Sequence, residues 1–144
     1  MSTDQEELQK LTEKWLSCWR TSLSEPFDIE TLRSLFHNGE ILVVDNFDDK
    51  VVMLHSFDQY ASTWNLSGFT EWSISCVETP KVLISIDLAV VTFVFVGRGK
   101  SQRGEPRSAA QHATHVWKKI SGSWCIVHEH LTSDEASKFV GPRS

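Results

Sequence analysis

The stretch that decides the fold is ATHVWKKISGSWCIVHEHLT, residues 113–132. Apolar and polar residues alternate on both sides of a Ser-Gly turn, and the β-branched and aromatic residues that strands favour are frequent. The pattern predicts a hairpin of two strands, residues 109–120 and residues 124–131. Three histidines lie in this stretch, and their role depends on the fold that the rest of the chain builds.

The two-residue period of a strand assigns these histidines to faces. It predicts that His115 lies on the same face as Trp117, and that His128 and His130 share a face with Trp124. Histidines two residues apart have the spacing of metal ligands, but a zinc site takes three or four protein ligands and no third one is near in the sequence. We therefore expect no metal site, and we expect this histidine pair to close the end of the strand.

Two further long strands are predicted upstream of the hairpin. Residues 70–78 and 82–96 are rich in β-branched and aromatic residues and are separated by Pro80. Both faces of LAVVTFVFV, residues 88–96, are apolar, so we expect this strand to lie centrally in the sheet with cover on each face. Residues 97–107, GRGKSQRGEPR, are predicted to form a loop.

The first half of the chain has helical spacing. Residues 4–21 are predicted to form an amphipathic helix, because Leu8, Trp15 and Trp19 fall on one stripe. Capping residues, apolar stripes and turns predict three further elements: a helix over residues 29–36, a hairpin of residues 41–45 and 50–54, and a helix over residues 56–65 that carries Tyr60 and Trp64. The last residues, 133–144, are predicted to be a partly ordered tail.

Helices followed by a run of antiparallel strands predict an α+β fold with the helices gathered on one face. A curved antiparallel sheet wrapped around the long N-terminal helix would form a cone, with the two other helices also on its inner face. The space between sheet and helices would then be core or pocket. A chain of 144 residues without repeats or linkers predicts a single domain over residues 1–144.

The composition of the chain limits the classes of partner that we expect for it. The net charge is -5 and the pI is about 5.6, which disfavours nucleic acid and membrane surfaces as partners. Three dispersed cysteines without a close pair indicate reduced thiols, not disulfides or a thiolate zinc site. The acidic, polar N-terminus lacks a secretion signal, and the longest apolar run has nine residues, so we expect a cytoplasmic protein. Six Trp and eight Phe indicate that aromatic residues line a cavity as well as a core.

The terminal segment THVWKKISGSWCIVHEHLT and the upstream segment LRSLFHNGEILVVD resemble the nuclear-transport-factor-2-like superfamily, and within it the SnoaL-like group. The superfamily also contains ketosteroid isomerases, polyketide cyclases and the association (hub) domain of calcium/calmodulin-dependent protein kinases. The resemblance covers nearly the whole chain. It implies the cystatin-like cone fold, but it does not select one activity because members with different functions share the motif.

The resemblance implies two catalytic residues. Asp45 ends the first strand one residue later than the general base of the isomerases, and could take a proton from a carbon next to a carbonyl. The alternative is that Asp45 only opens the turn after its strand. His115 takes the position of an acid in the isomerases and of an arginine in the kinase hubs, so it lines a pocket or is hydrogen-bonded in the core. The isomerase tyrosine is missing from the first helix, which has Trp15 and Trp19 instead, so that mechanism does not carry over intact.

Two hypotheses follow. The first is a SnoaL-like protein that binds an apolar, carbonyl-bearing small molecule inside the cone. Any chemistry would be cofactor-free isomerisation, cyclisation or hydration by Asp45 and His115, and whether turnover occurs is left open. The expected ligand-binding residues are Trp15, Trp19, Tyr60, Trp64 and His128. The second is a non-enzymatic association domain in which the outer face of the sheet forms a homodimer or a higher ring.

Overall fold

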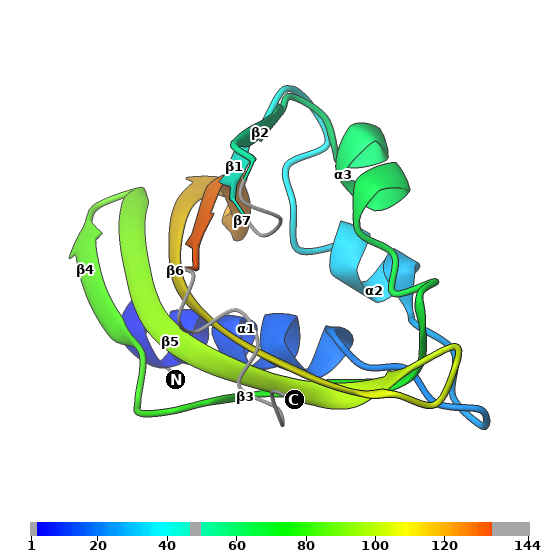
Figure 1. Cartoon of the computed structure of the whole chain (residues 1–144). Helices are drawn as coiled ribbons and strands as arrows, with labels where there is room; N and C mark the ends of the chain where they lie inside the picture. Colours follow the sequence, from blue (N-terminus) through cyan, green and yellow to red (C-terminus); the bar gives the residue numbers. More distant parts are fainter. Residues whose placement is uncertain (1–2, 47–49, 134–144) are drawn as a thin grey trace.

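The computed structural model describes residues 3–46 and 50–133. A seven-stranded sheet curves around three helices that lie on its concave side (Figure 1). This confirms the predicted α+β cone. The strand order is β2-β1-β7-β6-β5-β3, with β4 paired to β5 beside this path.

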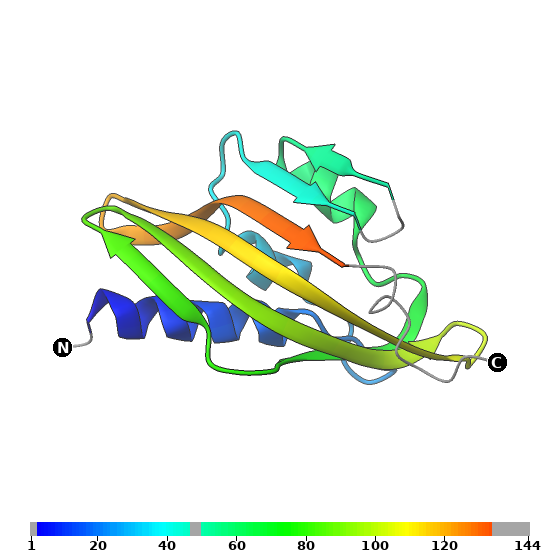
Figure 2. The ribbon, with the colours of Figure 1, turned by 60° about the vertical axis from the view of Figure 1, so that its left-hand side comes forward.

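Four long strands form the body of the sheet. They are β3 (Phe69–Cys76), β5 (Leu88–Ser101), β6 (Pro106–Ile120) and β7 (Ser123–Thr132). Each is antiparallel to the next in the order β3, β5, β6, β7, which is the predicted meander. Figure 2 shows β5 and β6 running the full length of the molecule alongside the N-terminal helix.

The sequence predicted a single strand over residues 82–96, but these residues do not form one strand. The chain turns at Ile86, which has a positive φ of 41°, and splits into β4 (Lys81–Ser85) and β5. β4 pairs with the first part of β5, while β3 pairs with its second part. The turn was missed because apolar and polar residues keep alternating from Ile84 to Leu88, which hides the break in the pattern.

Residues 97–107 are mostly strand, where a loop was predicted. β5 continues to Ser101 and β6 begins at Pro106, so only a short turn separates them. Gly97 and Gly99 lie inside β5 because a side chain there would overlap the ring of Trp72 and the backbone oxygen of Glu71. These glycines allow strands to approach closely, whereas the sequence pattern suggested turns.

The remaining strands form one end of the sheet. β1 (Leu42–Asp45) and β2 (Val52–Leu54) form the predicted hairpin, and residues 47–49 of its connection lie outside the described residues. β1 also pairs with β7, and this pairing is parallel. The sheet is therefore antiparallel except at this one junction.

The three predicted helices are present and begin at their predicted caps. α1 (Asp4–Cys18) starts with a capping box in which Thr3 and Glu6 exchange hydrogen bonds. Asp28 caps α2 (Ile29–Arg33), and Ser56 caps α3 (Phe57–Thr63). The first two helices end earlier than predicted, because Thr21 pairs with Trp72 of β3 and Phe36 bridges to Ile126 of β7.

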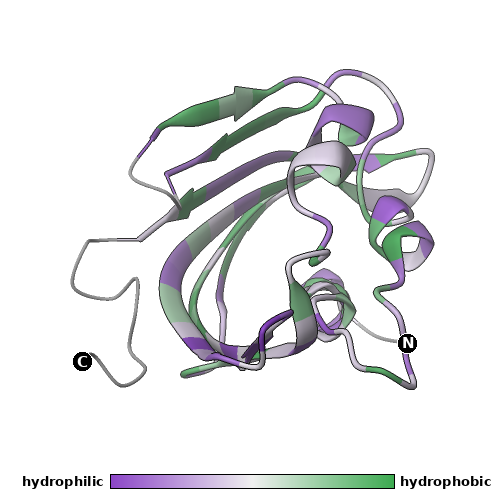
Figure 3. Ribbon diagram, turned by 45° about the vertical axis from the view of Figure 1, so that its right-hand side comes forward, coloured by the Kyte–Doolittle hydropathy of each residue, from purple (hydrophilic) through white to green (hydrophobic). Residues whose placement is uncertain are grey.

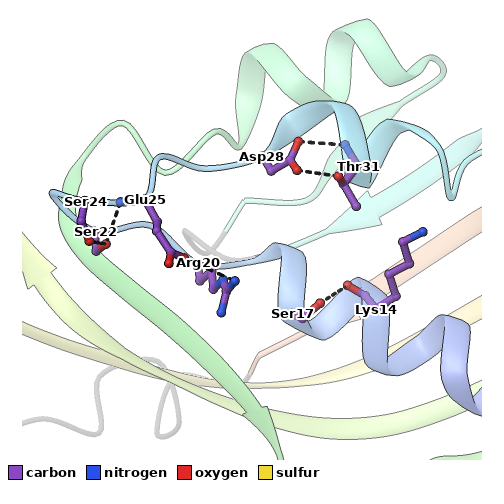
Figure 4. A network of polar contacts seen from close by, with 8 residues as sticks. All are labelled: Lys14, Ser17, Arg20, Ser22, Ser24, Glu25, Asp28 and Thr31. Carbon is purple, nitrogen blue, oxygen red and sulfur yellow. Dashed lines mark hydrogen bonds and ion pairs between the residues drawn. The ribbon is translucent and has the colours of Figure 1, made fainter.

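The connection between α1 and α2 is held by polar contacts on the surface (Figure 4). The hydroxyl of Ser22 accepts a hydrogen bond from the backbone N–H of Glu25 at 3.1 Å, and Arg20 pairs with the Glu25 carboxylate at 3.3 Å. Exposed contacts of this kind contribute little energy each. They fix the path by which α1 turns back towards α2.

The core fills the concave side of the sheet. α1 buries Leu8 and Trp15 against inward side chains of the long strands, among them Phe93 and Trp117. Figure 3 shows apolar and polar residues alternating along the strands around the enclosed α1. No helix within the described residues is long and apolar enough to cross a membrane.

The predicted tail begins with Ser133, whose backbone N–H donates to Asn46 Oδ1 at 2.9 Å. The rest of that tail, residues 134–144, lies outside the described residues.

Candidate functional site

A cavity of about 110 Å³ lies between α1, α3 and the inner face of the sheet. Its walls are mostly apolar, and its polar groups come from a small number of side chains. The lining residues are Trp15, Trp19, Asp45, Tyr60, Trp64, Leu66, Phe69, Trp72, Ile74, Phe95, Ala109, Gln111 and Leu131. A mostly apolar cavity with a few polar groups is typical of a small-molecule site.

Four of the predicted aromatic residues lie in these walls because of helical spacing. Trp19 is the C-cap of α1, four residues after Trp15, and the centroids of the two rings are 5.9 Å apart. Trp64 is the C-cap of α3, four residues after Tyr60, and these centroids are 5.7 Å apart. Trp19 and Tyr60 meet edge to face at 5.9 Å, which joins the two helices across the cavity.

Asp45 supplies the carboxylate of the cavity. It ends β1 on the inner face and is only 2% exposed. Gln111 of β6 donates a hydrogen bond from Nε2 to Asp45 Oδ1 at 3.3 Å. The sequence did not single out Gln111, although its inward position follows from the same two-residue period as His115.

His115 is fully buried, but it is not among the described residues that line the cavity. Its Nε2 lies 2.8 Å from Oε1 of Glu129, which is also fully buried. Its ring packs edge-on to Trp15 at 4.8 Å and lies against Phe93 at 5.5 Å. The structure thus brings Asp45 to the cavity and joins His115 to a different carboxylate.

Several buried polar atoms near the cavity have no hydrogen-bond partner among the described residues. They include Trp15 Nε1, Trp19 Nε1 and the Tyr60 hydroxyl. Burial, together with the nearby carboxylates of Glu129 and Asp45, raises the pKa of Tyr60 well above its ordinary value. Tyr60 therefore remains a neutral phenol at physiological pH, with the Glu129 carboxylate and the Trp15 indole close to its hydroxyl.

Glu129 is the residue that the sequence pattern assigned to the wrong face. A bulge shifts the register of β7, since Val116 of β6 opposes His128 whereas Trp117 opposes Ile126. One extra residue reverses the alternation after the bulge, so Glu129 points inward. The alternation alone carries no signal for the extra residue.

Because of the same bulge, the prediction that His128 and His130 share the face of Trp124 is wrong. Trp124 and Ile126 face inward, whereas His128 and His130 face outward. The Nδ1 atom of His128 lies 2.8 Å from the backbone oxygen of Leu42. His128 is therefore not part of the cavity wall for which it was predicted.

Part of the outer face of the sheet is also apolar. Leu83 of β4 is 76% exposed and lies opposite Val90 of β5, and Leu88 is 45% exposed. Along β5 the outward positions are Leu88, Val90, Thr92, Val94 and Val96, without a charge. We call Leu83 and these five residues the outer patch. A contiguous exposed apolar patch is typical of an interaction surface.

Within the described residues, no group of three or more His, Cys, Asp or Glu side chains is placed to hold a metal ion. The three cysteines are free thiols. Burial raises the pKa of the Cys18 thiol, which keeps it protonated and unreactive. The chemical groups of the cavity are thus one carboxylate, one amide, one phenol and indole N–H donors.

The family model of the calcium/calmodulin dependent protein kinase II association domain matches residues 4–135. The chain is also similar to a solved nuclear transport factor 2-like superfamily protein from Salmonella enterica, with 18% identity over 96% of each chain and a TM-score of 0.75. A search of curated proteins gave no match.

Two solved association domains have the same fold. The association domain of CaMKII from C. elegans has 18% identity over 89% of this chain and 91% of that chain, with a TM-score of 0.62. A putative calcium/calmodulin dependent protein kinase II association domain from Xanthomonas campestris has 15% identity over 93% of this chain and 90% of that chain, with a TM-score of 0.72. These neighbours confirm the resemblance to the nuclear-transport-factor-2-like superfamily and its cone fold.

Proposed function

The chain belongs to the calcium/calmodulin dependent protein kinase II association domain family, and from this premise we propose that it is a self-association domain whose outer patch packs against a second copy. The carrying observation is the exposure of Leu83 and Leu88 beside the outward valines of β5. Apolar side chains in such a row lose water favourably when another apolar surface covers them.

A second copy is the occupant that the family and the surface both favour. The matching family and the C. elegans relative are association domains by name. The patch itself has no charged side chain, but three cations border it: Lys81 of β4 lies opposite Thr92, Lys118 of β6 lies opposite Leu88, and Arg98 of β5 follows Val96. Two-fold symmetry would pair the same apolar row with itself, and closed two-fold dimers are the commonest homo-oligomers. A homodimer is therefore the expected unit, and further contacts between dimers would build a ring.

The test is the molar mass of the full chain in solution by size-exclusion chromatography with light scattering. The wild type should elute as a dimer or a larger assembly. The double variant Leu83→Lys/Leu88→Lys should be a folded monomer, because both side chains are exposed and only the association depends on them. Leu23→Lys is the matched control, since Leu23 is 94% exposed in the α1–α2 connection, away from the patch. A wild-type monomer, or an equally assembled double variant, would contradict the proposal.

A second function is supported by the cavity, and it is compatible with self-association. Buried donors without protein partners favour a ligand that carries an acceptor, such as a carbonyl oxygen. A cavity of about 110 Å³ suits a compound of roughly benzene size, since an engineered cavity of about 150 Å³ binds benzene. The ligand would be a small apolar carbonyl compound, bound between Trp15, Trp19, Tyr60 and Trp64.

Catalysis would use Asp45 as the base, because it is the carboxylate at the cavity. Tyr60 would donate a hydrogen bond to the carbonyl oxygen. His115 does not line the cavity, so it would act indirectly, through its bond to Glu129 and its contact with Trp15. The test begins with small cyclic enones in a thermal-shift assay, followed by exchange of the hydrogens next to the carbonyl into D₂O. Wild type should bind and exchange; Asp45→Asn should bind without exchange, and His115→Gln should weaken exchange. Absence of any thermal shift would remove the ligand-binding proposal while leaving self-association in place.

A further inference from the structure

We propose that His128 and His130 form a metal-binding pair on the outer face of the sheet, and that a divalent transition-metal ion such as Zn²⁺ bridges this pair to the same pair of a second copy. The inference rests on the proposed self-association through that face. It replaces the expectation from the sequence that the two histidines only close a strand.

The separation of the two rings is close to what a single ion requires. The bulge in β7 turns both side chains outward, where His128 is half-buried and His130 is exposed. Their ring centroids are 6.3 Å apart with an interplanar angle of 59°. A zinc–nitrogen bond is about 2.1 Å and the ring centre lies roughly 1.2 Å behind the nitrogen, so two ring centres are about 5.4 Å apart on a tetrahedral ion and about 6.6 Å apart only if the two bonds are collinear. The two rings would therefore have to approach each other by about 1 Å to share one tetrahedral ion.

A hydrogen bond already orients His128 as a ligand. Its Nδ1 lies 2.8 Å from the backbone oxygen of Leu42, which can only accept, so Nδ1 carries the proton. The lone pair is then on Nε2. Metal-bound histidines usually donate their other N–H to a carbonyl or carboxylate in this way, which fixes the tautomer and the ring.

His130 has a similar arrangement with the opposite nitrogen. Thr132 Oγ1 lies 3.3 Å from its Nε2, and in the tautomer in which this hydroxyl accepts the Nε2 proton, Nδ1 is free for a metal. The cross-strand neighbours of the pair on the outer face are uncharged: Leu42 and Val44 on β1, and Val116 and Thr114 on β6. An approaching cation therefore meets no lysine or arginine in these neighbouring positions.

The missing ligands point to a second copy. Zinc in structural sites almost always has four ligands, and the described part of one chain supplies no cluster of three. A two-fold axis between outer faces would bring the same two histidines from each copy to one ion. The pair also lies beside exposed apolar surface, because Leu42, opposite His128, is 38% exposed. One interface would then contain both the apolar contact and the ion.

The experiment uses the full chain with its affinity tag removed and its metals stripped by EDTA. Zinc is added, binding is measured by calorimetry, and molar mass is measured by light scattering. The expected result is one Zn²⁺ per two chains, with at least a tenfold tighter association that EDTA reverses. The variant His128→Ala/His130→Ala should lose both effects. His55→Ala is the matched control, because His55 is exposed and lies outside β1, β6 and β7, and it should behave as wild type.

The outcomes separate this inference from the proposed function. Assembly that is equal with zinc and with EDTA, in wild type and in the double variant, overturns the metal pair and leaves self-association standing. A wild type that is monomeric with and without zinc overturns both. Zinc binding that survives in the double variant, or that occurs without a change in molar mass, also overturns the inference.

Discussion

Glu129 and His115 form the one fully buried pair of ionisable side chains bonded to each other in the described structure. Each would be costly to bury alone, because a buried polar or charged group without a partner loses its hydration and gains no hydrogen bond in its place. Oε2 of Glu129 and Nδ1 of His115 have no further partner among the described residues. The bond at 2.8 Å is therefore the contact that offsets the burial of both side chains.

Replacing Glu129 should accordingly destabilise the protein strongly. We expect Glu129→Ala to lower the free energy of unfolding by about 3–5 kcal/mol, because it leaves His115 buried without a partner. Glu129→Gln keeps an acceptor oxygen for Nε2 and should cost less than half as much. Urea unfolding of the two variants beside wild type measures the difference. Equal losses in both would show that packing, and not the hydrogen bond, sets the cost.

At the scale of residues, the sequence pattern predicted which side chains face inward on regular elements. It failed beyond the bulge in β7. Trp15, Trp19, Tyr60 and Trp64 line the cavity because helical spacing holds along α1 and α3. Their roles as ligand-binding residues, and those of Asp45 and His115 in catalysis, stay predictions. The pairing of His115 was beyond the sequence, because the bulge that turns Glu129 inward depends on the register between β6 and β7.

At the scale of elements, the start of α1 is tied to the end of the sheet by Asp4. Its Oδ1 accepts hydrogen bonds from Lys119 Nζ at 3.1 Å and from Trp124 Nε1 at 3.3 Å. The hydrogen bond from Lys119, followed by that from Trp124, lowers the pKa of Asp4 below its ordinary value of 3.8. The negative charge also lies at the N-terminal end of the helix, where the helix dipole favours it.

This contact should make stability depend on pH in a defined direction. The carboxyl pKa is lower in the folded chain than in the unfolded chain, so the stabilisation is complete above 3.8 and is lost as the pH falls through the folded value. We expect Asp4→Asn to have a lower Tm than wild type at pH 7, and the gap to close towards pH 3. Melting curves across this range test it, with Glu13→Gln, an exposed position on the same helix, as the control. A gap that is constant with pH would contradict the role of the charge.

The pairing of β3 with β5 depends on two glycines. A Cβ at Gly99 would overlap the backbone oxygen of Glu71, and one at Gly97 would overlap the Trp72 ring. We expect Gly99→Ala to lower the free energy of unfolding by about 1–3 kcal/mol, since the backbone must move. Gly68→Ala is the matched control, because a Cβ there has no neighbour within 4 Å. Denaturant unfolding of both variants decides, and a neutral Gly99→Ala would mean that β3 can shift away without cost.

The elements differ in how far local pattern decides them. The β6–β7 hairpin, the caps of the three helices and the meander followed from residues close in sequence. The turn that separates β4 from β5 did not, because apolar and polar residues keep alternating through it. The parallel pairing of β1 with β7 did not either, because it joins segments with no local relation.

At the scale of the whole molecule, self-association should make stability depend on concentration. If only the folded chain associates, mass action stabilises it as concentration rises, by about 2.7 kcal/mol per dimer for a hundredfold increase. We expect the Tm of wild type to rise by several degrees over that range, whereas Leu83→Lys/Leu88→Lys should melt at one temperature throughout. Scanning calorimetry at several concentrations measures this. A wild-type Tm that is independent of concentration would contradict an assembly coupled to folding.

The parallel junction between β1 and β7 has a consequence for the order in which the chain folds. Leu42 and His128, which it brings together, are 86 residues apart in the chain. Closing so long a loop costs more entropy than closing the β5–β6 and β6–β7 hairpins, whose partners are near in sequence. The hairpins can therefore form early, whereas β1 and β2 can dock only after β7 is in place as an edge strand. Until β1 docks, β7 presents an unpaired backbone edge. The rate of this docking step therefore sets how long the edge of a newly made chain can pair with other chains.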